Sequence, residues 1–297
     1  MKSRRNGPAF FLSVRDSGFT ILELVVSIGI IGLLMAILLP AIAASREAAR
    51  RTTCASQLRQ IGIAAANYVE IHEVLPTPQL EASLNGTLFA EIDLSQLHGG
   101  PLAVLSCPSD PLIDDAGSRS RSYYLNHGST LDDEGNGVLH GLARSQAGRH
   151  VALSEITDGI SLTALASERL PPDPLLQADV DLGTLAGRNV KRVFRRTAST
   201  RSTIAEFADE CENRAGNVLP VWISRSIYNH VARPNSWNCT NGHPRDSDAK
   251  AAPPMSEHPG GVNLVFIDGH VQFIAEGIDH KTWWSLGTRN GNEAIAF

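Results

Sequence analysis

The sequence lacks the common catalytic motifs. It contains no G-x-S-x-G, no H-E-x-x-H and no P-loop, and the run Gly135-Asn136-Gly137 does not have the glycine spacing of a dinucleotide site. Only 19% of the 297 residues are charged, whereas 42% are hydrophobic. This composition excludes a collagen-like repeat and argues against a disordered chain or a polytopic membrane protein. We therefore expect a globular protein with no enzymatic activity and no cofactor.

Cysteine is also scarce. The four cysteines lie far apart, without a C-x-x-C pair and without the Cys/His spacing of a structural zinc site. Their even number suits two disulfides if the protein is exported, and four reduced, buried thiols if it stays in the cytosol. The residues are Cys54, Cys107, Cys211 and Cys239.

Positive charge is concentrated at the N-terminus and in one basic cluster far from it. The net charge is -5, yet residues 1–18 carry +3, which leaves -8 on the remainder and makes nucleic acid an unlikely partner. The second basic segment, residues 188–201, has six cations and no acid. It could bind an anionic polymer. The favoured interpretation is a solvated helical face whose charge is balanced by the acids of residues 206–212.

One apolar run stands out from this average composition. Phe19 to Leu39 has a single charge, Glu23, and at about 1.5 Å per residue a helix of this length spans a lipid bilayer. A secretory signal peptide is the alternative, because small residues follow at positions 41–43. The run is longer than a signal-peptide core, however, and a carboxylate inside it is costly. A membrane segment that is retained is therefore favoured.

The string SGFTILELVVSIGIIGLLMAILLP resembles the N-terminus of type IV prepilins and type II secretion pseudopilins. The matching residues are Gly18 before the cleavage site, Phe19 after it, Glu23 fifth in the mature chain, and Pro40 at the end of the apolar run. The resemblance implies that a prepilin peptidase removes residues 1–18 and methylates the new amine of Phe19. It also implies that an inner-membrane assembly platform packs the apolar helices with other pilin-like subunits.

Glu23 has a predicted partner in such a filament. A carboxylate in the bilayer needs a cation, and cleavage creates one in the amine of Phe19, best placed on a neighbouring subunit. Basic residues flank the apolar run equally, so charge leaves the topology open. The resemblance places the N-terminus in the cytoplasm and the C-terminal part in the periplasm or at the cell surface, on a single-pass inner-membrane anchor.

The sequence predicts four regions and an α+β, pilin-like fold. Residues 1–18 form the leader, 19–39 the transmembrane helix, and 40–75 an amphipathic helix whose apolar face includes Leu58, Ile61 and Ala65. Pro40 is expected to kink this long helix. Residues 76–297 read as short strands and loops, which predicts a mainly antiparallel β-sheet head domain covered by the helix.

The head also resembles a family. The stretches LSCPSDP, SYYLNHGS, DDEGNGV and LSEITDGISLTALASE are similar to a large prepilin-like family, abundant in planctomycetes, whose head domain has no assigned function. Its hallmark is a histidine followed after nine residues by Asp-Gly, here His258, Asp268 and Gly269. Given export, the order of the cysteines favours the pairs Cys54–Cys107 and Cys211–Cys239, one of three possible pairings.

Residues 258–274 predict a β-hairpin that turns at Asp268-Gly269 in a type I′ turn. Val262, Leu264 and Phe266 should face one side of it and Val265 and Ile267 the other, with the long helix covering one of the two sides. Asp279 should cap a last short helix that buries Trp283, Trp284 and Leu286 and ends at Gly287.

Two groups of residues could form a metal site, and structural roles are favoured for both. His258, His270 and Asp268 could bind a metal, but separate roles are favoured, with Asp268 supporting the turn and His258 anchoring the strand's entrance. Asp132, Glu134, Asn136 and Gly137 imitate the start of a calcium loop, yet position twelve is Ala143, which favours a solvated acidic turn. Two functions remain open: a filament subunit, or a membrane-tethered binding module for polysaccharide, nucleic acid or metal.

Overall fold

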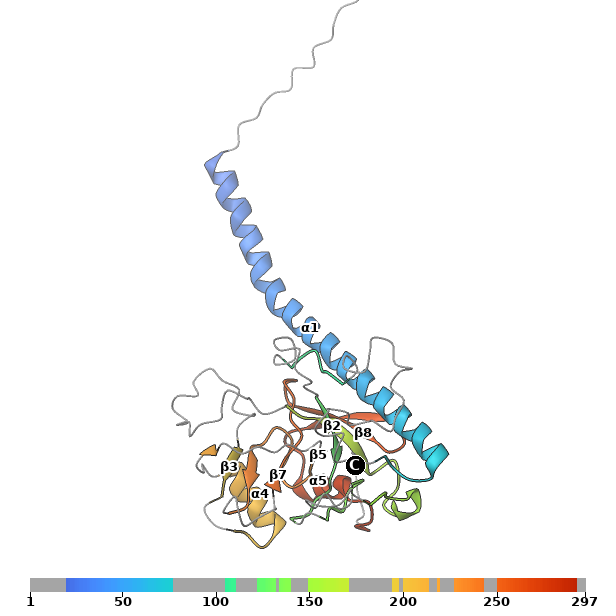
Figure 1. Cartoon of the computed structure of the whole chain (residues 1–297). Coiled ribbons are helices and arrows are strands. Elements are labelled where there is room, and N and C mark those ends of the chain that lie inside the picture. The colour runs from blue at the N-terminus through green and yellow to red at the C-terminus, as the bar shows by residue number, and fades with distance from the viewer. Residues whose placement is uncertain are drawn as a thin grey trace, which may run out of the picture. The chain divides into compact units, whose positions relative to one another are not determined.

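A computed structural model gives the fold of the protein (Figure 1). It describes residues 20–76, 105–110, 122–131, 134–139, 149–170, 194–197, 200–213, 218–219, 227–242 and 250–292. Gly18, Phe19 and the leader lie outside these residues, as do Asp132, Ala143 and most of the basic segment 188–201.

The N-terminal helix α1 runs without interruption from Ile21 to His72. Pro40 lies inside it, and the helix continues on both sides of this residue. The chain divides into two compact units, Met1–Arg46 and Glu47–Phe297, so the second part of α1 belongs to the same unit as the head. This division falls within the helix.

The described residues of the head form two sheets. The first has five strands in the order β5-β1-β2-β8-β9, all antiparallel neighbours except the parallel pair β1 and β5. Its strands are β1 (Tyr123–Asn126), β2 (Ala164–Glu168), β5 (Ile227–Tyr228), β8 (Gly261–Phe266) and β9 (Val271–Ala275). The predicted α+β fold with a mainly antiparallel sheet is confirmed.

The second sheet has four strands in the order β4-β3-β6-β7 and contains one parallel pair, β3 with β6. Its strands are β3 (Phe194–Arg196), β4 (Val218–Leu219), β6 (Asn238–Thr240) and β7 (Lys250–Ala251). Helix α4 (Ile204–Asn213) packs beside it through Phe207. The disulfide Cys211–Cys239 joins α4 to β6. In the chain between β1 and β2, residues Leu153–Glu155 form a short 3₁₀ helix, η2.

Strand β8 is buried on both faces, and each face meets a different helix. Val265 and Ile267 share a core with Leu58 and Ile61 of α1. Val262, Leu264 and Phe266 share another core with helix α5 (His280–Gly287). Because side chains alternate along a strand, this division follows from the sequence and confirms the predicted faces.

The hairpin turn differs from the prediction. A type I′ turn needs positive φ at both central residues, but of Asp268 and Gly269 only the glycine has it, with φ 85°. The N–H of Gly269 donates to the carbonyl of Phe266, and the N–H of Phe266 donates to the carbonyl of His270. This is the longer hairpin loop in which a left-handed glycine follows the turn.

The last helix begins as predicted and ends for another reason. The carboxylate of Asp279 accepts hydrogen bonds from the N–H groups of Lys281 and Thr282, which makes it the N-cap. Gly287 is the last residue of α5, but it does not have positive φ. A Cβ at this position would lie 2.6 Å from the His230 ring, so close packing requires the glycine.

Candidate functional site

Glu23, the acidic residue of the predicted processing motif, lies in the first turn of α1. Its carboxylate accepts hydrogen bonds from the N–H of Thr20 at 2.9 Å and from the Thr20 hydroxyl at 2.8 Å. The Thr20 hydroxyl in turn accepts from the N–H of Glu23 at 3.2 Å. These reciprocal bonds form a capping box, which the spacing T-x-x-E could have revealed but which our sequence reasoning missed. Glu23 thus has partners within its own chain before any subunit contact.

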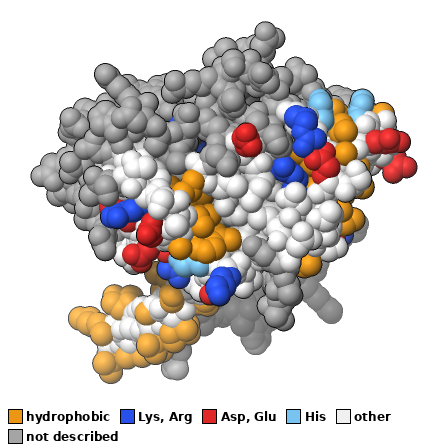
Figure 2. Space-filling view, turned by 90° about the horizontal axis from the view of Figure 1, so that it is seen from below, with side chains coloured by type: hydrophobic (Ala, Val, Ile, Leu, Met, Phe, Trp, Pro, Cys, Tyr) orange, Lys and Arg blue, Asp and Glu red, His pale blue; other side chains and the backbone are white. Residues whose placement is uncertain are grey.

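Helix α1 has the properties of a membrane anchor. Its hydrophobic side chains from Ile21 to Ile42 are exposed to about half or more of their area. Of the helices in the described part of the chain, it alone is long and apolar enough to cross a bilayer, by length and composition. In the face shown in Figure 2, the described acidic and basic side chains are interspersed, without a large patch of one sign.

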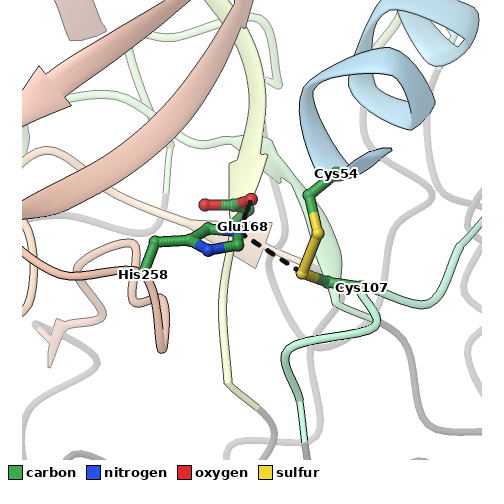
Figure 3. Close-up of side chains that lie close together, drawn as sticks. All are labelled: Cys54, Cys107, Glu168 and His258. Carbon is green, nitrogen blue, oxygen red and sulfur yellow. Dashed lines mark hydrogen bonds and ion pairs between the residues drawn. A yellow bond between two sulfur atoms is a disulfide. The ribbon is translucent and has the colours of Figure 1, made fainter. Parts of the chain in front are cut away.

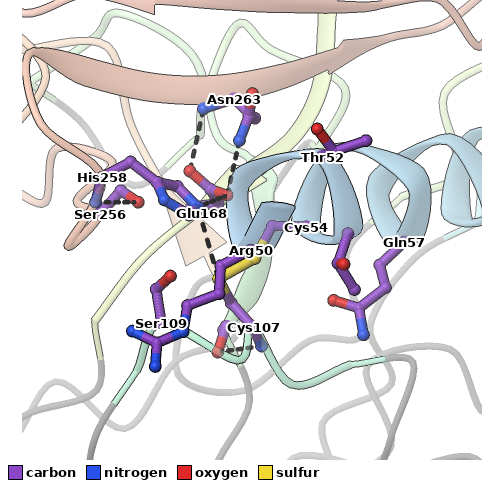
Figure 4. Close-up of polar contacts among 12 residues, drawn as sticks. Arg50, Thr52, Cys54, Gln57, Cys107, Ser109, Glu168, Ser256, His258 and Asn263 are labelled. Atoms are coloured by element: carbon purple, nitrogen blue, oxygen red, sulfur yellow. Dashed lines mark hydrogen bonds and ion pairs between the residues drawn. A yellow bond between two sulfur atoms is a disulfide. The ribbon is translucent and has the colours of Figure 1, made fainter. Parts of the chain in front are cut away.

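A buried cluster joins the start of the second unit to the sheet. His258 is fully buried and lies between the carboxylates of Glu168 and Glu47, of which Figure 4 labels Glu168. Its Nδ1 is 2.5 Å from Oε1 of Glu47 on α1, and its Nε2 is 3.3 Å from Oε1 of Glu168 at the end of β2. Burial disfavours the imidazolium, but the hydrogen bonds and charges of Glu168 and Glu47 outweigh it and raise the pKa of His258 above its ordinary value. The charged ring can therefore hold the helix and the sheet together.

Neighbouring groups fix both ends of this cluster. Glu168 is 2% exposed, and its two oxygens accept hydrogen bonds from the backbone N–H and the side-chain amide of Asn263 on β8, both at 2.9 Å. The backbone N–H of His258 donates to the hydroxyl of Ser256 at 3.2 Å. The ring and the buried carboxylate are thus held by hydrogen bonds as well as by packing.

The first disulfide lies against the same histidine (Figure 3). Cys54 of α1 is bonded to Cys107, and the Sγ of Cys107 is 3.6 Å from Nε2 of His258. Both disulfides in the structure, Cys54–Cys107 and Cys211–Cys239, are the pairs expected from chain order.

The hairpin's other signature residues have separate partners. Asp268 accepts from the backbone N–H of His270 at 3.1 Å, and its Oδ1 is 2.6 Å from Nδ1 of the same ring. Gly269 packs closely against α1, since a Cβ built on Gly62 would lie 2.9 Å from the Gly269 Cα. His258, Asp268 and His270 therefore do not form one metal site. His258 contacts Glu47 of α1 and Glu168 of β2.

The described part of the calcium-like run is occupied by an arginine. The guanidinium of Arg289 donates to the carbonyl oxygens of Gly135 and Gly137 at 3.1 and 2.9 Å. The side-chain oxygen of Asn136 accepts from the N–H of Ser129. The carbonyl oxygens of Gly135 and Gly137 and the side-chain oxygen of Asn136 thus already accept hydrogen bonds within the chain, which favours a structural role of this run over calcium binding.

Comparisons with known proteins agree with these features. A family model described as "Prokaryotic N-terminal methylation motif" matches residues 14–39, which makes the chain a prepilin-like protein with an N-terminal membrane anchor. A second model, described as "Protein of unknown function (DUF1559)", matches residues 43–91 and 83–281. The comparisons with curated proteins and with solved structures returned no match. Because the second model covers well over half of the 297 residues, the chain belongs to the DUF1559 family.

Proposed function

We propose that the protein is a structural subunit of a type IV pilus-like or secretion pseudopilus-like filament. The observation that supports this most strongly is the methylation motif over residues 14–39, which coincides with the exposed apolar part of α1. In this proposal a prepilin peptidase cleaves between Gly18 and Phe19 and methylates Phe19. The assembly platform of the inner membrane then packs α1 against the helices of other subunits, with the head in the periplasm or at the cell surface.

The two units suit different parts of this task. An exposed apolar helix is stable in a bilayer or against other apolar helices, and costly in water. The head, by contrast, has buried cores and two disulfides, which fit an oxidising compartment outside the cytoplasm. We propose no enzymatic activity for this subunit, and the alternative of a membrane-tethered binding module gains no support from the described surface.

The N-terminus of the mature protein tests the processing step. Mass spectrometry of the purified membrane protein should find a chain that begins at methylated Phe19. A bulky residue in place of Gly18 should block cleavage and leave the full-length chain in the membrane. A mature N-terminus at Ala44 would indicate signal peptidase and contradict the proposal.

Glu23 offers a test of assembly. A glutamine can keep the capping box with Thr20 but cannot neutralise the Phe19 amine of a neighbour, so Glu23→Gln separates capping from charge pairing. We expect normal leader removal in Glu23→Gln and in Glu23→Ala, and loss of both variants from sedimented filaments. If Glu23→Gln assembles at the wild-type level while Glu23→Ala does not, the residue acts as a cap and the pairing role is wrong.

A further inference from the structure

Four potential metal ligands converge in the core of the second unit. One ligand atom each from Cys54, Cys107, Glu168 and His258 lies within 4.8 Å of all the others, and all four residues are buried (Figure 3). They come from α1, the segment before β1, the end of β2 and the segment before β8. No other set of this kind occurs among the residues that the structure describes.

The spacing around Nε2 of His258 matches a tetrahedral zinc site. With Zn–N and Zn–O of about 2.0 Å and Zn–S of about 2.3 Å, tetrahedral ligand atoms lie about 3.3 Å apart for N and O and about 3.5 Å apart for N and S. The observed separations from Nε2 are 3.3 Å to Oε1 of Glu168 and 3.6 Å to Sγ of Cys107. The histidine and the carboxylate thus already have the mutual geometry of zinc ligands.

The groups that hydrogen-bond to these ligands are also those found around a zinc site. A zinc-bound histidine usually donates its other ring N–H to a carboxylate, which fixes the ring and its tautomer. Here Nδ1 of His258 is 2.5 Å from Glu47, and Nε2 is the nitrogen that faces Glu168 and Cys107. Asn263 holds both oxygens of Glu168 in the same way.

We propose that, when the Cys54–Cys107 disulfide is reduced, these four residues bind one Zn²⁺ ion, so that disulfide and metal are alternative states of one site. The reductant is a dithiol: it transfers two electrons and two protons to the disulfide, which becomes two thiols, and it is oxidised to its own disulfide. Zinc then binds both sulfurs as thiolates and displaces their two protons. The two sulfurs would separate to roughly 3.8 Å, the spacing of two tetrahedral thiolate ligands.

The test uses the full-length protein in detergent, reduced with a phosphine and titrated with Zn²⁺ against a chromophoric chelator. A Cys211→Ser/Cys239→Ser variant ensures that reduction opens only the Cys54–Cys107 bond. We expect one Zn²⁺ per reduced chain and none per oxidised chain, with Co²⁺ giving the absorption of a tetrahedral, thiolate-bound site. Zn²⁺ should protect Cys54 and Cys107 from alkylation, as mapped by mass spectrometry.

Two substitutions separate a built site from adventitious binding to thiols. His258→Ala should abolish stoichiometric binding. Glu47→Gln retains all four ligands and should weaken zinc affinity about 10–100-fold, whereas Glu70→Gln, exposed on the same helix, should leave it unchanged. Circular dichroism monitors folding: a reduced chain that unfolds but regains its structure with Zn²⁺ supports the proposal. Affinity that is insensitive to His258→Ala and Glu47→Gln, or a reduced chain that zinc neither binds nor refolds, would overturn it.

Discussion

Acidification should destabilise the head through His230, a buried histidine outside the cluster. Its ring stacks on Trp283 with centroids 3.9 Å apart, and its Nδ1 is 2.8 Å from the Trp283 carbonyl oxygen. A carbonyl can only accept, so Nδ1 carries the proton and Nε2, 3.2 Å from the Tyr228 hydroxyl, is free to accept. The ring is therefore neutral, and burial lowers the pKa of His230 to about 3.

The size of the effect follows from proton binding to the folded and unfolded chains. In the unfolded chain a histidine has its ordinary pKa of about 6.5. Between pH 6.5 and 3 the unfolded chain binds a proton that folded His230 rejects, so the free energy of unfolding falls as the pH is lowered. Well above pH 6.5 the histidine is neutral in both states, and the free energy of unfolding is not lowered by His230. Relative to pH 8, the loss is about 2 kcal/mol at pH 5 and about 4 kcal/mol at pH 3.

The assay compares the wild type with His230→Asn by urea unfolding of the full-length protein in detergent at pH 8 and pH 5. The asparagine amide can replace the Nδ1 donor but does not titrate, so the variant loses ring packing equally at both pH values. Other groups titrate in both proteins and cancel. The stability advantage of the wild type should shrink by about 2 kcal/mol from pH 8 to pH 5. An advantage that is the same at both pH values would refute the assignment of a neutral, buried His230.

Three further substitutions test the packing of the helices and the hairpin. Gly62→Leu should lower the free energy of unfolding by about 1–3 kcal/mol, because even a Cβ there would lie 2.8 Å from Val265. The control Ala66→Leu, on the exposed side of α1, should change it little. Equal effects of the two variants in urea unfolding would contradict this contact. Gly269→Ala should cost about 1–2 kcal/mol through its positive φ alone, since the nearest atom would be 3.9 Å away, and a neutral result in thermal melts would show that the loop relaxes. Asp279→Ala should lower the free energy of unfolding by about 1 kcal/mol, because it removes the N-cap of α5. Asp279→Asn should keep most of the wild-type stability in the same urea assay. An Asn variant as unstable as the Ala variant would show that charge, not capping, matters.

Local patterns in the sequence determined α1, α5 and the hairpin, but not β3, because residues 188–201 were expected to form a helical face and Phe194–Arg196 form a strand. The long apolar run and the spacing of Leu58, Ile61 and Ala65 indicated one helix with one buried face, and these three residues are buried in α1. The alternation of apolar residues along β8 indicated that each of its faces would meet its own core. Such features depend on residues a few positions apart, so periodicity is enough to read them.

Even local chemistry left some details undetermined. The dipeptide Asp268-Gly269 indicated a tight turn but not its type, because a glycine satisfies positive φ in more than one hairpin loop. Gly287 looked like a C-cap, yet its role is to make room for His230, which lies 57 positions earlier in the chain. A glycine in a sequence marks a need for space or for positive φ without saying which.

Only the tertiary structure decided which distant residues meet. His258 binds Glu47, 211 positions away, and Asn263 binds Glu168, 95 positions away. The parallel pairing of β1 with β5 and of β3 with β6 likewise joins strands that are not neighbours in sequence. One sequence contains many glutamates and histidines in equivalent local surroundings, and nothing near Glu47 marks it as the partner of a buried histidine. Packing of α1 on the sheet selects that partner, because an ionised group taken out of water must be paired where the chain happens to bring its counter-charge.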